Sequence, residues 1–252
     1  MKNITFRNIR RLGQKVFEND FYIHVHNPEM LLQYDSNFIR FKRMPAMDEF
    51  KQAEEYLRFY HKKFGQNHLR FYFPEGEKLT TKLSNYMNHE ANYTIGFLEL
   101  FAIQPTDFVA VADHPDIVVE KVAHDTLESF LQFQYEQDAV YGHNYAEQKQ
   151  GQHLRNFKDE NILQIIALYK GGLAGSADVI IAEDTAEIDG LVVKEDFQRK
   201  GIGSRIQKFV MDEFLDKTVV LVADGEDTPK EMYRKQNYQY LGFQYESLKL
   251  DE

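Results

Sequence analysis

The segment that most constrains how this chain folds runs from Glu187 to Phe209, EIDGLVVKEDFQRKGIGSRIQKF. It is typical of an apolar strand, a short basic turn with two glycines, and an amphipathic helix. Such a connection leaves several backbone N–H groups of the first helical turn unpaired, and Gly201 and Gly203 keep them free of Cβ atoms. We therefore predict that this turn binds a phosphate-like anion.

The turn does not fit the two common nucleotide-binding motifs. It lacks the lysine-serine ending of the P-loop, and Gly201-x-Gly203-x-x-Ile206 lacks the third glycine of the dinucleotide fingerprint. Taken alone, the two glycines are better explained by an ordinary helix start than by an anion site. Basic side chains that suit an anionic ligand, or a solvated charged helix face, surround the turn: Lys194, Arg199, Lys200, Arg205 and Lys208.

The wider pattern resembles the acetyl-CoA signature of the GCN5-related N-acetyltransferase (GNAT) family. That signature is Q/R-x-x-G-x-G/A after a strand that ends in L-x-V, and the chain reads Leu191-Val192-Val193, then Gln198-Arg199-Lys200-Gly201-Ile202-Gly203. The resemblance implies that acetyl-CoA is the cosubstrate, bound mainly through backbone groups. The positions that it assigns to coenzyme binding are Leu191, Val192, Val193, Gln198, Arg199, Lys200, Gly201, Ile202, Gly203 and Ser204.

Periodicity in the second half of the chain gives an element order that agrees with this resemblance. Strands are predicted at 117–123, 162–169, 173–181, 186–193 and 219–223, and two short strands around Gly242 within 238–250. Helices are predicted at 126–140, 144–157 and 202–214, with a short one that carries Tyr233. The resemblance implies a GNAT fold of the mixed α/β (α+β) class, in which helices flank a mixed, mostly antiparallel central sheet.

The first half of the chain repeats part of this order. Strands are predicted within 21–43, at 68–73 and at 92–101, and helices at 47–64 and 77–88. The stretch at 83–100 also looks like that at 231–250, so we predict a tandem arrangement: a degenerate GNAT-like domain at 1–113 and a catalytic domain at 114–252. No glycine lies at the corresponding turn, 42–46, and Pro45 removes a donor there, so no coenzyme binding is expected. Two unrelated α/β pieces are the alternative.

Acetyl transfer to an amine needs a base for the amine and an acid for the departing thiolate. Glu187 lies eleven residues before Gln198, the spacing of the catalytic glutamate in histone-acetylating GNAT members, so the resemblance implies that Glu187 is the base. Asp189 is the second candidate, because Glu187, Asp189, Leu191 and Val193 share one face of a regular strand. The alternative is a solvent-facing acidic residue at the start of a strand.

Tyr233 stands at the position of the family's tyrosine acid, and its alternative role is to cover the core. The local sequence resembles the family's x-Y-x-K-x-G-F, with Asn237 in place of the glycine. Asparagine tolerates the left-handed conformation of a helix C-cap, so we expect Asn237 to adopt it.

Composition excludes several classes of protein. No apolar run approaches the ~18 residues of a membrane span, and the start of the chain lacks the features of a secretory signal, so we expect a cytoplasmic protein without membrane contact. Zero cysteines exclude disulfides, thiolate metal sites and an acyl-cysteine intermediate, and the net charge of −10 argues against nucleic-acid binding. His24 and His26 share a strand face without a third ligand, so no metal site is predicted.

We conclude from the sequence that the chain is an acetyl-CoA-dependent N-acetyltransferase that moves the acetyl group directly to a primary amine. A non-catalytic acyl-CoA-binding regulatory module or a scaffold protein is the alternative. The acceptor is expected to be a small molecule or a peptide. The aromatic residues of the first half indicate either a packed core or an interface such as that of a homodimer.

Overall fold

The computed structural model describes residues 4–225 and 229–251 and divides the chain into two compact units. The C-terminal unit consists of residues 101–222 and 231–240, and the N-terminal unit of the described residues of 4–100, 223–230 and 241–252. Each unit takes segments from both halves of the chain, because strands β5 (Thr94–Ile103) and β11 (Gln239–Leu250) each begin in one unit and end in the other. The domain boundary between residues 113 and 114 stays a prediction.

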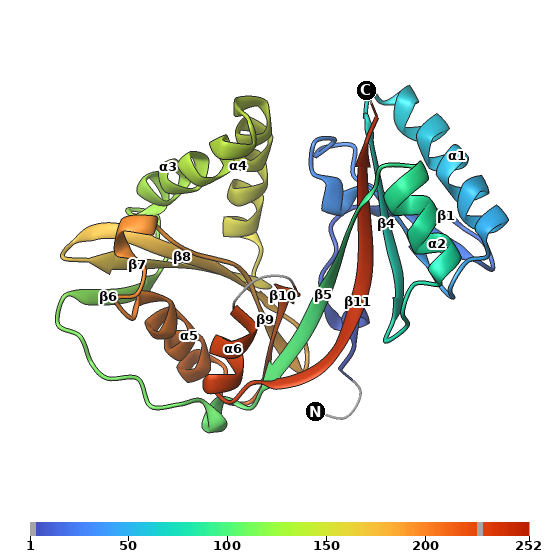
Figure 1. The fold of residues 1–252 in the computed structure, drawn as a ribbon. Helices are drawn as coiled ribbons and strands as arrows, with labels where there is room; N and C mark the ends of the chain where they lie inside the picture. The colour runs from blue at the N-terminus through green and yellow to red at the C-terminus, as the bar shows by residue number, and fades with distance from the viewer. Residues whose placement is uncertain (1–3, 226–228, 252) are drawn as a thin grey trace. The chain divides into compact units, whose positions relative to one another are not determined.

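The C-terminal unit is a mixed, mostly antiparallel sheet between helices (Figure 1). Its strands are β6 (Ile117–Lys121), β7 (Ile162–Tyr169), β8 (Gly172–Ile181), β9 (Thr185–Val193) and β10 (Thr218–Asp224). They lie in the order β6-β7-β8-β9-β10, and the one parallel pair among them is β9 with β10. Helices α3 (Leu127–Asp138) and α4 (His143–Lys158) cover one face, and α5 (Ile202–Glu213) covers the other.

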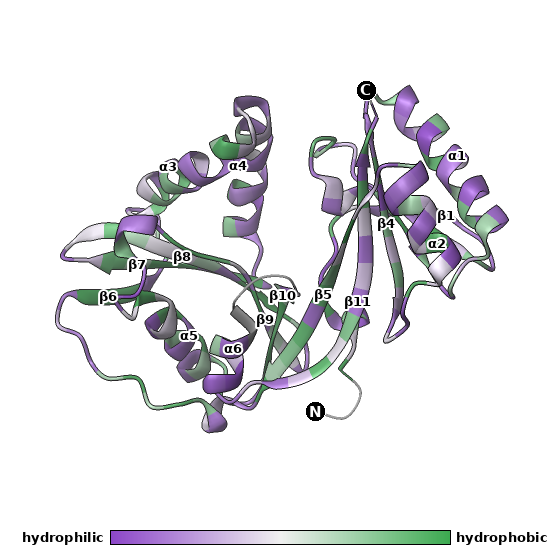
Figure 2. Cartoon of the chain, viewed as in Figure 1, coloured by the Kyte–Doolittle hydropathy of each residue, from purple (hydrophilic) through white to green (hydrophobic). Residues whose placement is uncertain are grey.

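The hydrophobic pattern explains these layers. Strand β7, which lies between β6 and β8, is apolar over most of its length and largely buried, as a strand covered on both faces must be. Helix α5 turns Ile202, Ile206, Val210 and Met211 into the core at helical spacing. By contrast, α4 is hydrophilic over most of its surface (Figure 2), and its inward face carries polar groups as well as Ala146. The layer between α4 and the sheet therefore contains polar as well as apolar side chains.

The N-terminal unit also packs helices on a sheet. Its strands are β1 (Gln14–Glu18), β2 (Tyr22–His26), β3 (Phe38–Phe41) and β4 (His68–Glu75), followed in the sheet by β11 and β5. Helix α1 (Met47–Lys63) and helix α2 (Thr81–Asn85), which continues as a π-helical turn over Tyr86–Glu90, bury one face of it. Phenylalanines dominate this core, among them Phe41, Phe50, Phe71 and Phe73.

The predicted repeat of element order is confirmed. The series β3-α1-β4-α2-β5 recurs as β9-α5-β10-α6-β11, where α6 spans Pro229–Lys235. In both series the first two strands are parallel, as a β-α-β crossover requires. Two element predictions were wrong. Strand β1 was missed because every one of its residues is exposed. The two short strands expected around Gly242 are one strand, β11, in which Gly242 does not adopt a positive φ.

The last strands of the two series are exchanged between the units. From Gln244 to Leu250, β11 pairs antiparallel with β4 of the N-terminal unit, while β5 ends in the C-terminal unit, where β10 is its neighbour. An ion pair fixes β11 in place: Arg70 Nη2 lies 2.6 Å from Glu246 Oε2, and both side chains are only 12% exposed. Asp35 provides a second carboxylate at 2.9 Å from the same nitrogen.

Replacing Glu246 tests this exchange. Glu246→Ala should destabilise the N-terminal unit by about 3 kcal/mol, because it leaves a largely buried guanidinium with one of its two carboxylates. The same change should speed amide hydrogen exchange in β4, measured by mass spectrometry. Lys249→Ala on the same strand is the control and should cost less than about 1 kcal/mol. Unchanged exchange in β4 would argue against the pairing.

Candidate active site

The predicted anion-binding turn has the geometry that its glycines indicate. Arg199 and Gly201 both adopt left-handed backbone conformations, with φ of 60° and 86°. A Cβ atom at Gly201 would meet no other atom within 4 Å, so this glycine serves the backbone conformation and leaves the space above it open. The side chain of Gln198 ties the turn to the end of β9, because its Nε2 donates to the carbonyl oxygen of Val193 at 3.3 Å.

The first turn of α5 presents free backbone donors. The first α-helical bond runs from Arg205 N to Gly201 O, 3.0 Å apart, so the amides of Ile202, Gly203 and Ser204 have no partner within the helix. A Cβ at Gly203 would lie 3.7 Å from Leu191 Cδ2, so glycine or alanine lets the helix start pack against the end of β9. These residues fit a diphosphate, which such amides and the positive end of the helix dipole bind.

The basic cluster around the turn carries less free charge than its sequence indicates. Three of its five members are ion-paired in the structure: Arg205 with Asp113 at 2.7 Å, Lys208 with Asp212 at 2.5 Å, and Lys194 with Glu136 at 3.3 Å. Two of these carboxylates come from segments far along the chain, which residue spacing does not reveal. Backbone donors, more than side-chain charge, therefore define the anion site.

A β-bulge interrupts β9 beside this turn. Val192 lies opposite Ser176 on β8, and Asp189 lies opposite Asp178. Between these two pairs β9 has one residue more than β8. Gly190 makes the bulge feasible, since its φ of 59° is in the left-handed region.

The bulge overturns the expectation that Glu187, Asp189, Leu191 and Val193 share one face. Leu191 and Val193 contact the start of α5 around Gly203. Asp189 lies on the opposite face with Asp178, whose carboxylate accepts a hydrogen bond from α4. Glu187 and Asp189 both precede the bulge and are two residues apart, so their side chains still share a face. The bulge thus separates the acidic side chains from those that support the anion site.

Strands β9 and β10 are paired only at their first residues. The parallel register ends with Ile188 opposite Leu221, although β9 continues to Val193 and β10 to Asp224. Beyond this point β9 is paired with β8 alone among its described neighbours. The other edge of Asp189 to Val193 can therefore form strand-like hydrogen bonds with an extended ligand that contains amide groups.

The candidate bases differ in exposure. Glu187 is 6% exposed and lies where β9 is still paired on both sides, with Ile180 and Val220 as its neighbours. Asp189 is exposed at the point where β9 and β10 part. Both residues therefore lie near the point where β9 and β10 separate. Glu187 is buried within the sheet, and Asp189 is exposed at its surface.

Tyr233 belongs to the same region through helix α6. Gln236, which follows α6, donates from Nε2 to Ser204 Oγ in the first turn of α5 at 3.3 Å. The Tyr233 ring packs 5.5 Å from that of Phe101 and 5.5 Å from that of Tyr238. Burial raises the pKa of Tyr233, so its phenol stays protonated at neutral pH, as a proton donor must.

The end of α6 confirms one sequence prediction. Asn237 adopts the left-handed conformation with φ of 70°, and the amide of Tyr238 donates to Tyr233 O at 3.0 Å, as in a Schellman cap. The Asn237 side chain also donates to Asp107 O at 2.9 Å, a bond that glycine could not form. Asparagine thus replaces the glycine of the family pattern and adds a tertiary contact.

Sequence reasoning missed one acidic residue of this region. Asp178 on β8 accepts a hydrogen bond from Asn156 Nδ2 of α4 at 2.9 Å. Burial raises the pKa of Asp178, and the charge of Asp189 raises it further. Only the hairpin register brings the two aspartates together, and no signal in the sequence specifies that register across a bulge.

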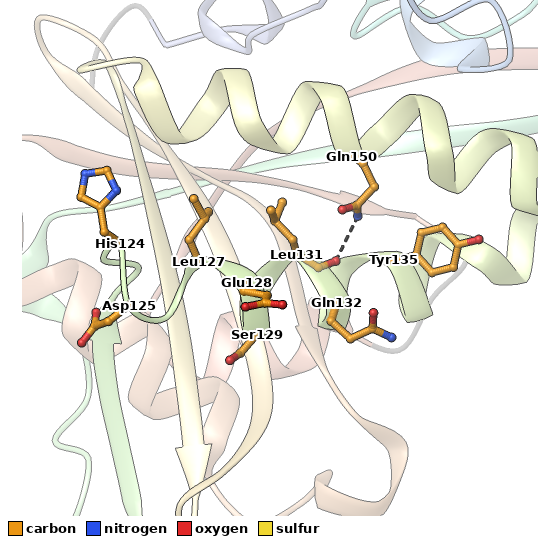
Figure 3. Close-up of a pocket in the computed structure, with 9 residues that line it drawn as sticks. All are labelled: His124, Asp125, Leu127, Glu128, Ser129, Leu131, Gln132, Tyr135 and Gln150. Carbon is orange, nitrogen blue, oxygen red and sulfur yellow. Dashed lines mark hydrogen bonds between the residues drawn. The ribbon is translucent and has the colours of Figure 1, made fainter.

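A pocket of about 770 Å³ lies along α3 in the same unit. Figure 3 shows Gln150 reaching from α4 to the backbone of Leu131, where its Nε2 donates at 3.0 Å. His124, Asp125, Glu128 and Tyr135 also line it. The pocket contains none of the residues that the sequence assigns to the site.

Neither a metal centre nor a membrane span is found in the described part of the chain. His24 and His26 are buried rather than on a polar face, and burial lowers the pKa of both. Among the described residues, no group of three or more histidine or acidic side chains is placed to hold a metal ion. Over residues 4–225 and 229–251, no helix is long and apolar enough to cross a membrane.

Family models match both parts of the chain. Residues 123–238 match the acetyltransferase (GNAT) family, and residues 4–101 match a domain of unknown function, DUF5613. The second half of the chain therefore carries a GNAT acetyltransferase domain. Comparison with curated protein sequences gives no match.

Solved structures place the whole chain in a family. A functionally unknown conserved protein from Staphylococcus epidermidis ATCC 12228 is 32% identical with a TM-score of 0.90, and the match covers 99% of each chain. The chain belongs to the same family as this protein.

More distant structures share the fold. A GCN5-related N-acetyltransferase from Sphaerobacter thermophilus gives a TM-score of 0.64 at 12% identity, covering 91% of this chain and 76% of that one. A tandem GNAT protein from the clavulanic acid biosynthesis pathway gives 0.52 at 9% identity, covering 84% and 75%. The predicted GNAT fold class is confirmed.

Gly175 keeps the bulged strand in place, and its replacement tests this geometry. A Cβ there would lie 2.8 Å from the backbone oxygen of Val192, which cannot move without displacing β9. Gly175→Ala should therefore destabilise the C-terminal unit by about 1–3 kcal/mol, measured by denaturant unfolding. Gly172→Ala on the same strand should change the unfolding free energy by at most about 0.5 kcal/mol, because its Cβ would make an ordinary 3.6 Å contact. Equal effects would contradict the argument.

Proposed function

We propose that the chain is an acetyl-CoA-dependent N-acetyltransferase that transfers the acetyl group directly to a primary amine. One observation supports this most: the edge of β9 from Asp189 to Val193, which no described strand pairs, is joined by the short connection 194–201 to the donor array at the start of α5. The first feature suits the amide-containing pantetheine arm, and the second suits the diphosphate. The coenzyme fits the residues present, since no Cβ atom of Gly201 or Gly203 obstructs the amides.

The catalytic roles follow from the positions of three side chains. Glu187 is proposed as the base that takes a proton from the amine, with Asp189 as the alternative, since both lie where β9 and β10 part. Tyr233 is proposed as the acid that protonates the departing thiolate, because a tyrosine phenol carries its proton at neutral pH and stands at the position that the family resemblance assigns to the acid. The proposed acceptor is a small molecule or a peptide with a primary amine, and the proposed location is the cytoplasm.

A non-catalytic acyl-CoA-binding protein is the second candidate. Such a protein would have the same coenzyme site as the enzyme but would lack the catalytic acids and the tyrosine. Because Glu187, Asp189 and Tyr233 are all present, the enzymatic function is favoured.

Coenzyme binding can be tested at the turn. Gly201→Val and Gly203→Val should weaken acetyl-CoA binding at least about tenfold in isothermal titration, since they obstruct the amides. Arg199→Ala should weaken it by no more than about fivefold, as expected for one exposed charge.

The control for backbone strain is Gly65→Val, just after helix α1. Gly65 has φ of 69° and no atom within 4 Å of its Cβ position, much as Gly201 has, but it belongs to the N-terminal unit. Its acetyl-CoA affinity should be unchanged. If both glycine variants of the turn fold and bind acetyl-CoA normally, the proposed coenzyme site is wrong.

The catalytic roles can be tested by kinetics over a panel of primary amines. Glu187→Gln and Tyr233→Phe should each lower the turnover rate by roughly 10²-fold, the low end of general acid–base contributions. The deficit of Glu187→Gln should shrink as the pH rises, because free amine then becomes available without a base. The deficit of Tyr233→Phe should persist with unchanged acetyl-CoA affinity. A normal rate for Glu187→Gln with a crippled Asp189→Asn would assign the base to Asp189.

A further inference from the structure

The sheet of the N-terminal unit carries a cluster of arginines on the face away from α1 and α2 (Figure 1). Ile39 and Phe41 of β3 belong to the core under these helices, so Arg40 between them points to the opposite face. Tyr72 of β4 lies beside Arg40 in the parallel register and shares this face. The segment before β1 brings Arg11 to the same place, with its guanidinium carbon 4.6 Å from the centre of the Tyr72 ring.

The carboxylates that lie at this ring already have partners. Arg70 is a further arginine over Tyr72, 5.2 Å from the ring centre, and its Nη2 is 2.9 Å from Asp35 and 2.6 Å from Glu246. The phenol of Tyr72 donates to Asp35 Oδ1 at 3.0 Å. Among the described residues, neither acid forms an ion pair with any other arginine. Both carboxylates therefore neutralise Arg70 first.

Three arginines of this face have no carboxylate partner: Arg7, Arg11 and Arg40. Over residues 4–225 and 229–251, none of them forms an ion pair, although the chain as a whole has a net charge of −10. Burial lowers the pKa of Arg40, and the charges of Arg11 and Arg7 lower it further, so both guanidinium groups lie near it. Glu18 has the opposite effect, but its carboxylate is paired with two lysines, Lys15 and Lys42.

Arg11 adds an independent observation. Its Nη2 is buried and has no hydrogen-bond partner. A buried donor without a partner destabilises a fold, and so does a desolvated cation without a counter-ion. An anion between the three side chains would remove both penalties. Arg7 is exposed while Arg11 and Arg40 are half-buried, so a ligand can reach the cluster from the solvent.

We propose that Arg7, Arg11 and Arg40 bind the phosphate group of a small molecule, at a site separate from the turn before α5. A guanidinium fork pairs with two phosphate oxygens at once, and a phosphate carries more negative charge than a carboxylate, so it matches three arginines better. The site uses side chains of the part that matches DUF5613, whereas the turn offers backbone amides. The N-terminal unit, which is expected to bind no coenzyme, thus has a ligand of its own.

Arginine side-chain signals can report binding at this site alone. The full chain, labelled with ¹⁵N at arginine side chains, would be titrated with inorganic phosphate and, separately, with glycerol 3-phosphate. Arg11→Met and Arg40→Met would assign two of the signals. We expect both signals to shift saturably, and acetate at the same ionic strength to shift neither. Equal affinity for the two phosphates would identify free phosphate as the ligand, and tighter binding of glycerol 3-phosphate would identify an organic phosphate.

Matched variants test the role of each arginine. Arg40→Met should weaken phosphate binding at least about tenfold, measured on the Arg11 signal, because it removes a charge-assisted contact. Arg43→Met is the control and should leave the affinity unchanged, since Arg43 follows the same strand but is exposed and paired with Glu49.

Hydrogen exchange of β3, measured by mass spectrometry, separates binding from a structural role. Without ligand, Arg40→Met should leave this exchange unchanged or slow it, because it removes an unpaired charge and keeps an apolar side chain. Phosphate at ten times its dissociation constant should slow exchange about tenfold in the unmodified chain, but not in Arg40→Met.

The proposal is overturned if neither phosphate shifts the Arg11 and Arg40 signals, or if acetate shifts them equally. Faster β3 exchange in ligand-free Arg40→Met, with no effect of phosphate on the unmodified chain, would assign these arginines a structural role instead. Shifts caused by a short DNA duplex but by neither phosphate would assign a nucleic-acid surface. None of these results depends on acetyl-CoA, because the three arginines belong to the N-terminal unit.

Discussion

The left-handed backbone at Gly190 is the constraint on which the rest of the site depends. It allows one extra residue in β9, and that residue reverses which face each later side chain occupies. As a result Leu191 and Val193 support the start of α5, while Glu187 and Asp189 face the helices on the other side. A regular strand would have placed the apolar residues and the acids on one face. The bulge thus gives the proposed coenzyme and the proposed acceptor separate surfaces of the same strand.

Local patterns in the sequence predicted much of this structure. Periodicity located most helices and strands, because a buried face imposes its spacing on each element, and the glycine turn was recognisable because only certain residues adopt left-handed conformations. Asn237 was predicted on the same physical ground and is found in that conformation. The failures share a different cause. Every residue of strand β1 is exposed, and its two hydrophobic residues, Val16 and Phe17, are adjacent rather than alternating, so hydrophobic periodicity does not reveal this strand.

Long-range pairing could not be predicted from residue spacing. The partner of Arg205 is Asp113, and the partner of Asp189 across the hairpin is Asp178, but spacing alone specifies neither. The assumption of regular alternation in β9 failed for the same reason, since a bulge is a property of two strands rather than one. From the sequence, the basic cluster looked free to bind an anion, because the carboxylate partners of Lys194 and Arg205 lie far away in the sequence.

The exchange of final strands has a consequence for synthesis on the ribosome. Strand β4 acquires its neighbour β11 only after residues 244–250 have emerged, and Arg70 and Glu246 are 176 residues apart. Contacts so distant in sequence make folding slow, and until they form, the edge of β4 stays open to pairing with other chains. The N-terminal unit, although made first, is therefore completed last. A chaperone that shields a nascent sheet edge would be needed most during that interval.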